Sequence, residues 1–226
     1  MKVITKTKNI LIIGLSTFSQ YLAKKLYANG MNVIVIDKNK ELIQDIKDNV
    51  STAVLADISD QNILTKFAKN FDGVILISLG SNFEKTVFTL FYLKKLNLQN
   101  IYVKALNEEQ ADILKLLGAD EIIIPERDMA LKLADSFLNP NVIESIALSE
   151  KYKIIEISVP QYFIDKTLID LKVRNLYNIN VIAVKKYTTG EIIVSEVINY
   201  KFEANDKIII LGLKEDIKKF ENSFSK

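Results

Sequence analysis

Short apolar runs alternate with longer segments of helical periodicity through the first 125 residues of the chain. This alternation is typical of repeated βαβ units around a parallel sheet. The pattern therefore predicts an α/β fold with a doubly wound parallel sheet. The expected strands are Asn9–Ile13, Asn32–Ile36, Thr52–Leu55, Gly73–Ile77, Ile101–Lys104 and Glu121–Ile124.

Helical periodicity occupies several of the intervening segments. We expect helices over Ser16–Asn29, Ser81–Leu96 and Glu108–Leu117. Ser81 is the expected N-cap of the second of these. A further amphipathic helix, Arg127–Leu138, follows the sixth strand. Because the sheet is already complete, the apolar face of this helix needs other cover, and a partner subunit is the natural place.

The pattern changes after Asn139-Pro140-Asn141, where an X-Pro step disfavours a continuing helix. We therefore expect one domain over residues 1–139 and a second, small α+β domain over residues 140–226. The second domain's expected elements are strands Lys153–Val159, Asn180–Val184, Ile192–Ser195 and Lys207–Leu211, a hairpin turn at Thr189-Gly190, and a final helix Glu215–Phe224.

Composition removes many kinds of chemistry. The chain has no Cys and no His, which excludes disulfides, thiolate or imidazole catalysis, and metal sites built on these residues. A net charge of +2 gives no reason to expect a nucleic-acid partner. The early apolar run Ile10–Leu15 is far too short to span a membrane. These features predict a soluble, cytoplasmic protein.

The segment Gly14-Leu15-Ser16-Thr17-Phe18-Ser19 lies between the first strand and the first helix, and Asp37 ends the second strand. This is the context of the dinucleotide-binding fingerprint, in which glycines admit a pyrophosphate and an acid takes the ribose hydroxyls. Asp37 favours an adenosine without a 2′-phosphate. Two alternatives stay open: Asp37 is the N-cap of the next helix, or the sheet has lost nucleotide binding and serves assembly alone.

A NAD-dependent oxidoreductase of the doubly wound class is a further alternative. Dehydrogenases without a catalytic His use a Tyr-x-x-x-Lys pair, and the chain has this spacing at Tyr21–Lys25 and Tyr162–Lys166. Neither pair lies at a catalytic position of such folds, and about one pair is expected by chance from the composition. We therefore expect no enzymatic activity.

Charged residues also follow three other strands of the predicted sheet. Asp57 follows the third strand, Lys104 ends the fifth, and Glu126 with Asp128 follows the sixth. In open α/β sheets ligands bind at this carboxyl edge. Lys104 there could meet a phosphate, and the two acids could meet a cation.

Several stretches resemble the RCK-type regulatory subunits of bacterial potassium uptake systems, the KtrA/TrkA family. The resemblance spans the whole chain. It is carried by Asn9–Phe18, Val33–Asp37, Ala56-Asp57, Val103-Lys104-Ala105, Leu117–Asp120, Pro125–Met129, Ile169–Arg174 and Leu211–Asp216.

The resemblance implies a Rossmann-like RCK N-terminal domain, a crossover helix at about residues 126–138 used for dimerisation, and a small α+β RCK C-terminal domain. In this family eight subunits form a cytosolic ring beneath a separate membrane potassium-conducting subunit of the KtrB or TrkH kind. Adenine nucleotides in the ring, ATP/ADP or NAD/NADH, bias the open or closed channel. The chain would thus be peripheral to the inner face of the cell membrane.

The resemblance also assigns roles to individual residues. Glu126 would lie at a subunit interface and help to bind a divalent cation, Mg²⁺ or Ca²⁺. In similar proteins the C-terminal domain binds cyclic di-AMP, and the matching polar contacts here are Arg174 and Asn180. The nucleotide contacts implied for the N-terminal domain are Gly14, Ser16, Thr17, Phe18, Asp37, Lys38, Asp57 and Lys104.

The loop after the first strand departs from the family pattern Gly-x-Gly-Arg-Phe-Gly. Ser16 and Ser19 replace the second and third glycines, and Thr17 replaces the arginine that would reach the terminal phosphate. The identity of the nucleotide and the direction of its effect therefore stay open.

Overall fold

Six parallel strands form the sheet of the first of two compact units, Met1–Ala130. The spatial order is β3-β2-β1-β4-β5-β6, so the predicted doubly wound sheet is confirmed. The computed structural model describes residues 8–138 and 142–224 of the chain. The strands are β1 (Asn9–Ile13), β2 (Asn32–Asp37), β3 (Thr52–Leu55), β4 (Val74–Ile77), β5 (Ile101–Lys104) and β6 (Glu121–Ile123).

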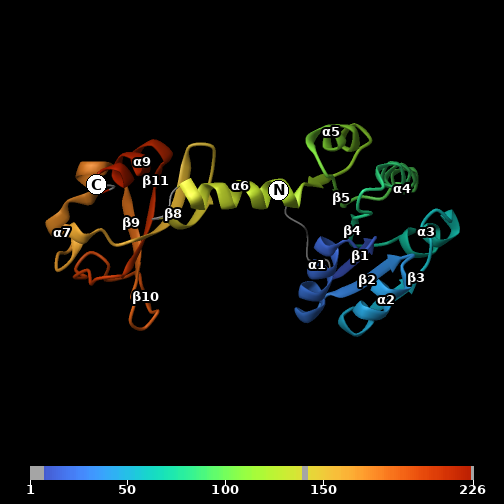
Figure 1. Ribbon diagram of the computed structural model, residues 1–226, viewed down its shortest axis with the longest axis horizontal. Helices are drawn as coiled ribbons and strands as arrows, with labels where there is room; N and C mark the ends of the chain where they lie inside the picture. The colour runs from blue at the N-terminus through green and yellow to red at the C-terminus, as the bar shows by residue number, and fades with distance from the viewer. Residues whose placement is uncertain (1–7, 139–141, 225–226) are drawn as a thin grey trace. The chain divides into compact units, whose positions relative to one another are not determined.

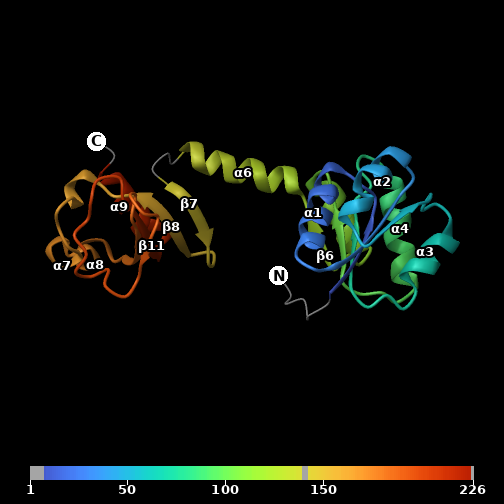
Figure 2. The same ribbon diagram turned by 90° about the horizontal axis from the view of Figure 1, so that it is seen from below.

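Helices cover both faces of this sheet (Figure 1). The first two helices pack against a cluster around Ile12 and Val35, whereas the next three pack against Leu11, Ile13 and Ile75. Figure 2 shows α1 and α4 on opposite sides of the strands. The helices are α1 (Thr17–Ala28), α2 (Lys40–Ile46), a 3₁₀ turn at Lys47–Asn49, α3 (Gln61–Ala68), α4 (Phe83–Lys95), α5 (Glu108–Leu116) and α6 (Pro125–Leu138).

The second unit, Leu131–Lys226, contains an antiparallel sheet in the order β10-β9-β11-β8-β7. Its core joins Ile155 and Ile208 of the sheet to Phe163 and Phe220 of the helical segments. The elements are β7 (Val142–Ala147), β8 (Tyr152–Ser158), a 3₁₀ turn at Gln161–Phe163, α7 (Leu168–Leu171), α8 (Val173–Tyr177), β9 (Asn180–Lys185), β10 (Ile192–Ile193), β11 (Lys207–Leu213) and α9 (Lys214–Asn222).

Several details differ from the sequence-based expectations. Strand β7 was not expected, and neither were helices α3, α7 and α8. The N-cap of α4 is Asn82 and not Ser81, because the Asn82 side chain accepts the hydrogen bond of the Lys85 amide at 3.0 Å. The proposed boundary at Asn139-Pro140-Asn141 lies outside the described residues.

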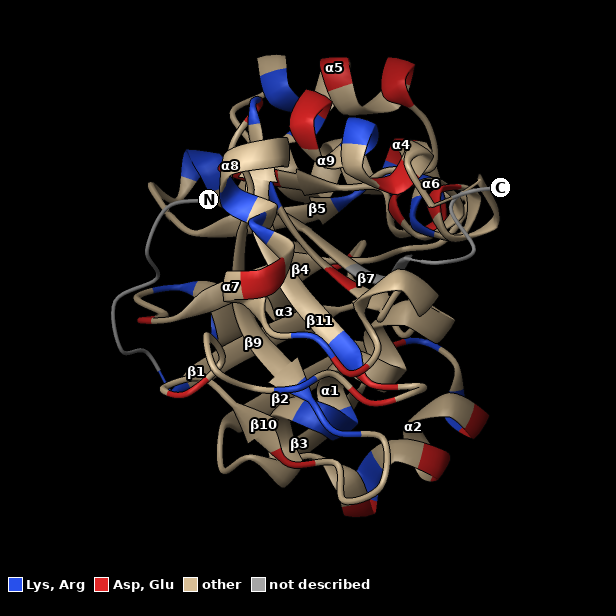
Figure 3. Cartoon of the chain, turned by 90° about the vertical axis from the view of Figure 1, so that its left-hand side faces the viewer, with Lys and Arg blue, Asp and Glu red and all other residues tan. Residues whose placement is uncertain are grey.

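Helix α6 carries exposed apolar side chains, among them Met129 at 56% and Phe137 at 79% exposure. Their cover by a partner subunit stays a prediction. Basic and acidic segments are interspersed along the ribbon and do not separate by sign (Figure 3). No helix within the described residues is long and apolar enough to cross a membrane.

Candidate functional site

A cleft lies at the carboxyl ends of the central strands of the first unit. Strands β1 and β4 are neighbours in the sheet but not consecutive in the chain, so the chain leaves them toward opposite faces and a crevice forms between the loops. A cavity of about 250 Å³ occupies this place. It is lined by Gly14, Leu15, Ser16, Ile36, Asp37, Lys38, Ala56, Asp57, Ile58, Ser78, Leu79, Gly80, Asn82 and Lys85.

Gly14 makes the turn out of β1. Its φ of +95° is one that side-chain-bearing residues rarely adopt, and a β-carbon there would lie 2.4 Å from the Ser78 carbonyl oxygen. The Gly14 amide donates to the carbonyl of Ile36 at 2.9 Å. The loop after β1 is thus held close to both neighbouring strands, as a phosphate-binding turn requires.

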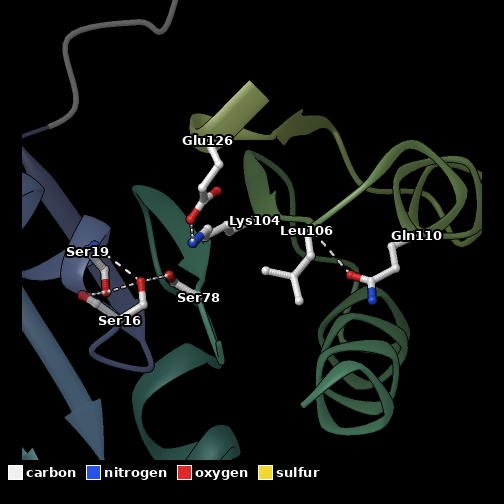
Figure 4. Close-up of polar contacts among 7 residues, drawn as sticks. All are labelled: Ser16, Ser19, Ser78, Lys104, Leu106, Gln110 and Glu126. Atoms are coloured by element: carbon white, nitrogen blue, oxygen red, sulfur yellow. Dashed lines mark hydrogen bonds and ion pairs between the residues drawn. The ribbon is translucent and has the colours of Figure 1, made fainter. Parts of the chain in front are cut away.

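Ser16 replaces the second glycine of the fingerprint without backbone strain, since its φ of −64° suits any residue. It is the N-cap of α1, and its hydroxyl lies 2.6 Å from the Ser78 hydroxyl on the loop after β4 (Figure 4). Because Ser16 also lines the cleft, its hydroxyl and the first amides of α1 form a polar end suited to an anion.

Ser19 replaces the third glycine and is fully buried. Its hydroxyl donates to the Gly14 carbonyl at 2.8 Å, which ties the first turn of α1 to the loop after β1. The hydroxyl therefore has a partner at the position where the family pattern has a glycine, and Ser19 acts on the shape of the loop.

The two residues between these serines do not line the cleft. Thr17 is exposed at the first position of α1, and the ring of Phe18 packs against the apolar cluster beneath α1. The structure does not bring either side chain to the cleft, so the backbone amides are the groups through which these residues could meet a phosphate.

Asp37 closes the cleft from the end of β2. Its carboxylate accepts hydrogen bonds from the Leu15 amide and the Asn39 amide, both at 2.7 Å. The alternative of an N-cap role for Asp37 is wrong, because Asn39 caps α2. Each carboxylate oxygen retains a lone pair for a ribose hydroxyl, and the two amides fix its direction. Lys38 lines the cleft beside it.

Asp57 lines the cleft at the end of β3 and forms an ion pair with Lys85 of α4, at 3.2 Å. The amide and hydroxyl of Ser59, followed by the Lys85 ammonium, lower the pKa of Asp57 from 3.8 to about 2. The carboxylate is therefore ionised at neutral pH and acts only as an acceptor.

Lys104 and Glu126 form a second ion pair near the cleft but do not line it. The Lys104 ammonium lies 2.6 Å from the Glu126 carboxylate (Figure 4), and this hydrogen bond lowers the pKa of Glu126. Lys104 is nearly buried, with 8% of its side chain exposed, whereas Glu126 is 62% exposed. The exposed acid is thus held ionised on the surface.

A cation at Glu126 would need ligands beyond this protomer's side chains. No cluster of three or more acidic residues suited to a metal occurs within residues 8–138 and 142–224. One exposed carboxylate, already paired with an ammonium, does not complete a Mg²⁺ or Ca²⁺ site by itself. Water, backbone carbonyls, nucleotide phosphates or a second copy would have to supply the other oxygens.

Arg174 and Asn180 both lie in the second unit, on α8 and at the start of β9, and both are exposed. Between them, Asn178 donates to the Asp216 carboxylate at 2.9 Å and so anchors the turn from α8 to β9. Their part in binding cyclic di-AMP stays a prediction.

The sequence analysis did not predict the residues that form one wall of the cleft. Ser78, Leu79, Gly80 and Asn82 come from the loop after β4, and Lys85 comes from the first turn of α4. The signal for the loop was available, since the fourth strand was predicted and is the neighbour of the first in a doubly wound sheet.

Comparison with known proteins agrees with this geometry. The TrkA-N domain model matches residues 10–125 and the TrkA-C domain model matches residues 153–225. Ktr system potassium uptake protein A of Bacillus subtilis is 35% identical over 96% of this chain and 97% of its own length.

Two solved structures share the fold at lower sequence identity. The GsuK RCK domain is 16% identical with a TM-score of 0.64, and the alignment covers this whole chain and 49% of that one. The GsuK channel bound to NAD is 19% identical with a TM-score of 0.51, over 98% of this chain and 39% of that one. The chain therefore belongs to the family of TrkA-N and TrkA-C domain proteins, the non-enzymatic RCK regulators of potassium transport.

Proposed function

We propose that this chain is a nucleotide-sensing subunit that regulates a membrane potassium-conducting protein of the KtrB or TrkH kind. The single observation that carries the ligand assignment is the cleft, where the Gly14 turn, the start of α1 and Asp37 surround one cavity of about 250 Å³. The ligand is an adenine nucleotide, ATP/ADP or NAD/NADH. The relative whose structure holds NAD has the same fold, which supports this class.

The polar groups of the cleft indicate where each part of an adenine nucleotide would bind. The phosphates lie at the start of α1, where free amides and the Ser16 hydroxyl donate. The ribose lies at Asp37, whose carboxylate accepts from its hydroxyls. The Asp37 carboxylate would repel a 2′-phosphate at this position. We therefore expect NADPH to bind more weakly than NADH.

Regulation requires that the nucleotide bind two states of an assembly unequally. The bound phosphates must therefore touch a contact that differs between the two states. We assign that contact to Thr17, Lys104 and Glu126, of which Glu126 is exposed and ionised. The assembly is a ring built from dimers, eight copies in all, on the cytoplasmic side of the membrane. A divalent cation, Mg²⁺ or Ca²⁺, would join Glu126 to the bound phosphates or to a neighbouring copy.

Potassium flux tests the regulatory part of the proposal. Proteoliposomes that hold a Ktr-type membrane subunit are measured with and without this chain, in the presence of ATP, ADP or NADH. We expect flux that depends on the nucleotide with the wild-type chain and not with Asp37→Ala. If the wild-type chain binds the membrane subunit but no nucleotide changes the potassium flux, the proposal is contradicted. The alternative that the chain serves assembly alone would then be favoured.

The C-terminal ligand needs its own experiment. Titration of the full chain with cyclic di-AMP should give saturable binding that Arg174→Ala weakens and Asp37→Ala leaves unchanged. Equal binding by wild type and Arg174→Ala would remove Arg174 from the site.

A further inference from the structure

Lys85 lies where two cavities of the first unit meet. The nucleotide cleft is the first, and the second is a groove of about 510 Å³ between α3 and α4. Ile58, Asn82 and Lys85 line both. Lys85 lies in the first turn of α4. Its backbone amide donates a hydrogen bond to the side chain of the N-cap residue Asn82 at 3.0 Å. The backbone of Lys85 is therefore fixed, and its side chain lies between the cleft and the groove.

The ammonium is held against Asp57 across this border. Its nitrogen lies 3.2 Å from Oδ1 and 3.4 Å from Oδ2 of the Asp57 carboxylate. The Ser59 amide donates to Oδ1 at 2.9 Å and fixes the carboxylate in turn. Both groups keep spare capacity, since an ammonium has three N–H donors and a carboxylate accepts about four hydrogen bonds. The pair therefore offers a ligand one donor and one acceptor at fixed places.

A nucleotide bound as proposed above would place its base at this end of the cleft. With phosphates at α1 and ribose at Asp37, the base extends toward β3, because β2 and β3 are neighbours and Asp37 pairs with Leu55. The Ala56 amide donates to the Asp37 carbonyl at 2.9 Å, so Asp57 lies just beyond the ribose position. Lys85 faces it from the other wall.

We propose that Lys85, together with Asp57, determines base specificity by reading the 6-amino group and the adjacent ring nitrogen of adenine. This inference rests on the nucleotide-binding function proposed above. Adenine places an amino donor beside the ring acceptor N7, whereas a 6-oxo purine places two acceptors there. Asp57 only accepts and Lys85 only donates, so adenine satisfies both. A 6-oxo purine sets its carbonyl oxygen against the carboxylate and leaves an acceptor unpaired.

Calorimetric titration of the full chain with ADP and with inosine diphosphate tests this assignment. The two ligands carry the same phosphates and differ at the 6-position and N1 of the purine, so the ratio of their affinities isolates the base. We expect wild type to prefer ADP by at least about tenfold. Lys85→Met keeps the methylene stem without the ammonium, and should reduce the preference to less than about threefold.

Lys95→Met is the matched control, because Lys95 lies on the same helix and lines the groove but not the cleft. It should keep the wild-type preference. Lys85→Leu, which also removes the donor, is the second variant if Lys85→Met does not fold. NAD and its hypoxanthine analogue replace the two diphosphates if the chain binds only dinucleotides.

Two results would overturn the inference while leaving nucleotide sensing intact. One is ADP binding with no preference over inosine diphosphate in wild type. The other is an undiminished preference in folded Lys85→Met or Lys85→Leu. Absence of binding of every adenine nucleotide to wild type would instead contradict the proposed function on which the inference rests.

Discussion

The Ser78 carbonyl oxygen occupies the space that a side chain at position 14 would need. A β-carbon at Gly14 would lie 2.4 Å from that oxygen, and the φ of +95° adds strain for any other residue. The loop after β1 consequently depends on one glycine, whereas the two later fingerprint positions accept serine because Ser16 has an ordinary φ and Ser19 donates to Gly14.

Gly14→Ala should therefore lower the free energy of unfolding of the first unit by about 2 kcal/mol or more. Gly30→Ala is the control, since Gly30 also has a positive φ of +80° but a β-carbon added there would meet no atom within 4 Å. Its cost should be about 1 kcal/mol, from backbone strain alone. Denaturant unfolding of both variants makes the comparison, and equal losses would contradict the steric argument.

The Asp57 carboxylate should titrate at an unusually low pH. Its pKa of about 2 lies below the ordinary value of 3.8, so its stabilising contribution is present above pH 3.8 and is lost as the pH falls toward 2. In Lys85→Met the pKa should rise but stay below 3.8, because the Ser59 hydrogen bonds contribute more than Lys85. NMR titration of the Asp57 carboxyl carbon measures both, and a wild-type midpoint near 3.8 would contradict the described contacts.

At the scale of elements, hydrophobic patterning located all six strands of the first sheet, because parallel strands buried on both faces read as continuous Ile and Val runs. It missed β7, which begins two residues after Pro140, and the short helices α3, α7 and α8, which have 8, 4 and 5 residues. Caps were harder to place, since Ser81 and Asn82 are both good capping residues and only the local geometry selects one.

Asn82→Ala should lower stability by about 1 kcal/mol, because it removes the acceptor of the Lys85 amide at the start of α4. Ser81→Ala should change stability by less than about 0.5 kcal/mol, as expected of an exposed residue with no capping bond. Thermal or denaturant unfolding of the pair separates the two assignments, and the reverse order of losses would make Ser81 the cap.

The candidate site was predicted only in part. Gly14, Ser16, Asp37, Lys38 and Asp57 line the cleft as a doubly wound sheet implies. Thr17, Phe18 and Lys104 do not line it, because Thr17 is exposed on α1, Phe18 packs against the apolar cluster beneath α1, and Lys104 pairs with Glu126. Lys85 gave no sequence signal, because its partner Asp57 lies 28 residues earlier and only the packing of α4 brings them together.

At the scale of the whole molecule, the chain consists of two units, each with its own apolar core. This organisation agrees with the expectation of two domains. Membership of the family of regulatory subunits confirms the expectation that the chain is not an enzyme. Under the proposed function, the exposed Glu126 end of the Lys104–Glu126 pair is the place where we expect the nucleotide site to meet another copy.

Glu126→Gln should uncouple binding from regulation. The variant loses the charge that a cation or a neighbouring subunit would recognise, while the cleft, which Glu126 does not line, stays intact. We expect nucleotide affinity within about threefold of wild type in the absence of divalent cations, and loss of the nucleotide and cation dependence of potassium flux. Unchanged dependence of flux on nucleotide and cation would remove Glu126 from the mechanism.

Nucleotide binding in the cleft is tested most directly by calorimetric titration of the full chain with ATP, ADP, NADH and NADPH, with and without Mg²⁺ or Ca²⁺. We predict saturable binding of at least one of the first three ligands, weaker binding of NADPH, and a loss of at least about tenfold in affinity in Asp37→Ala. Asp45→Ala, a change of an exposed acid on α2 outside the cleft, should bind as wild type does. Absence of binding by all these nucleotides at millimolar concentration, or equal binding by Asp37→Ala, would contradict the assignment of the cleft.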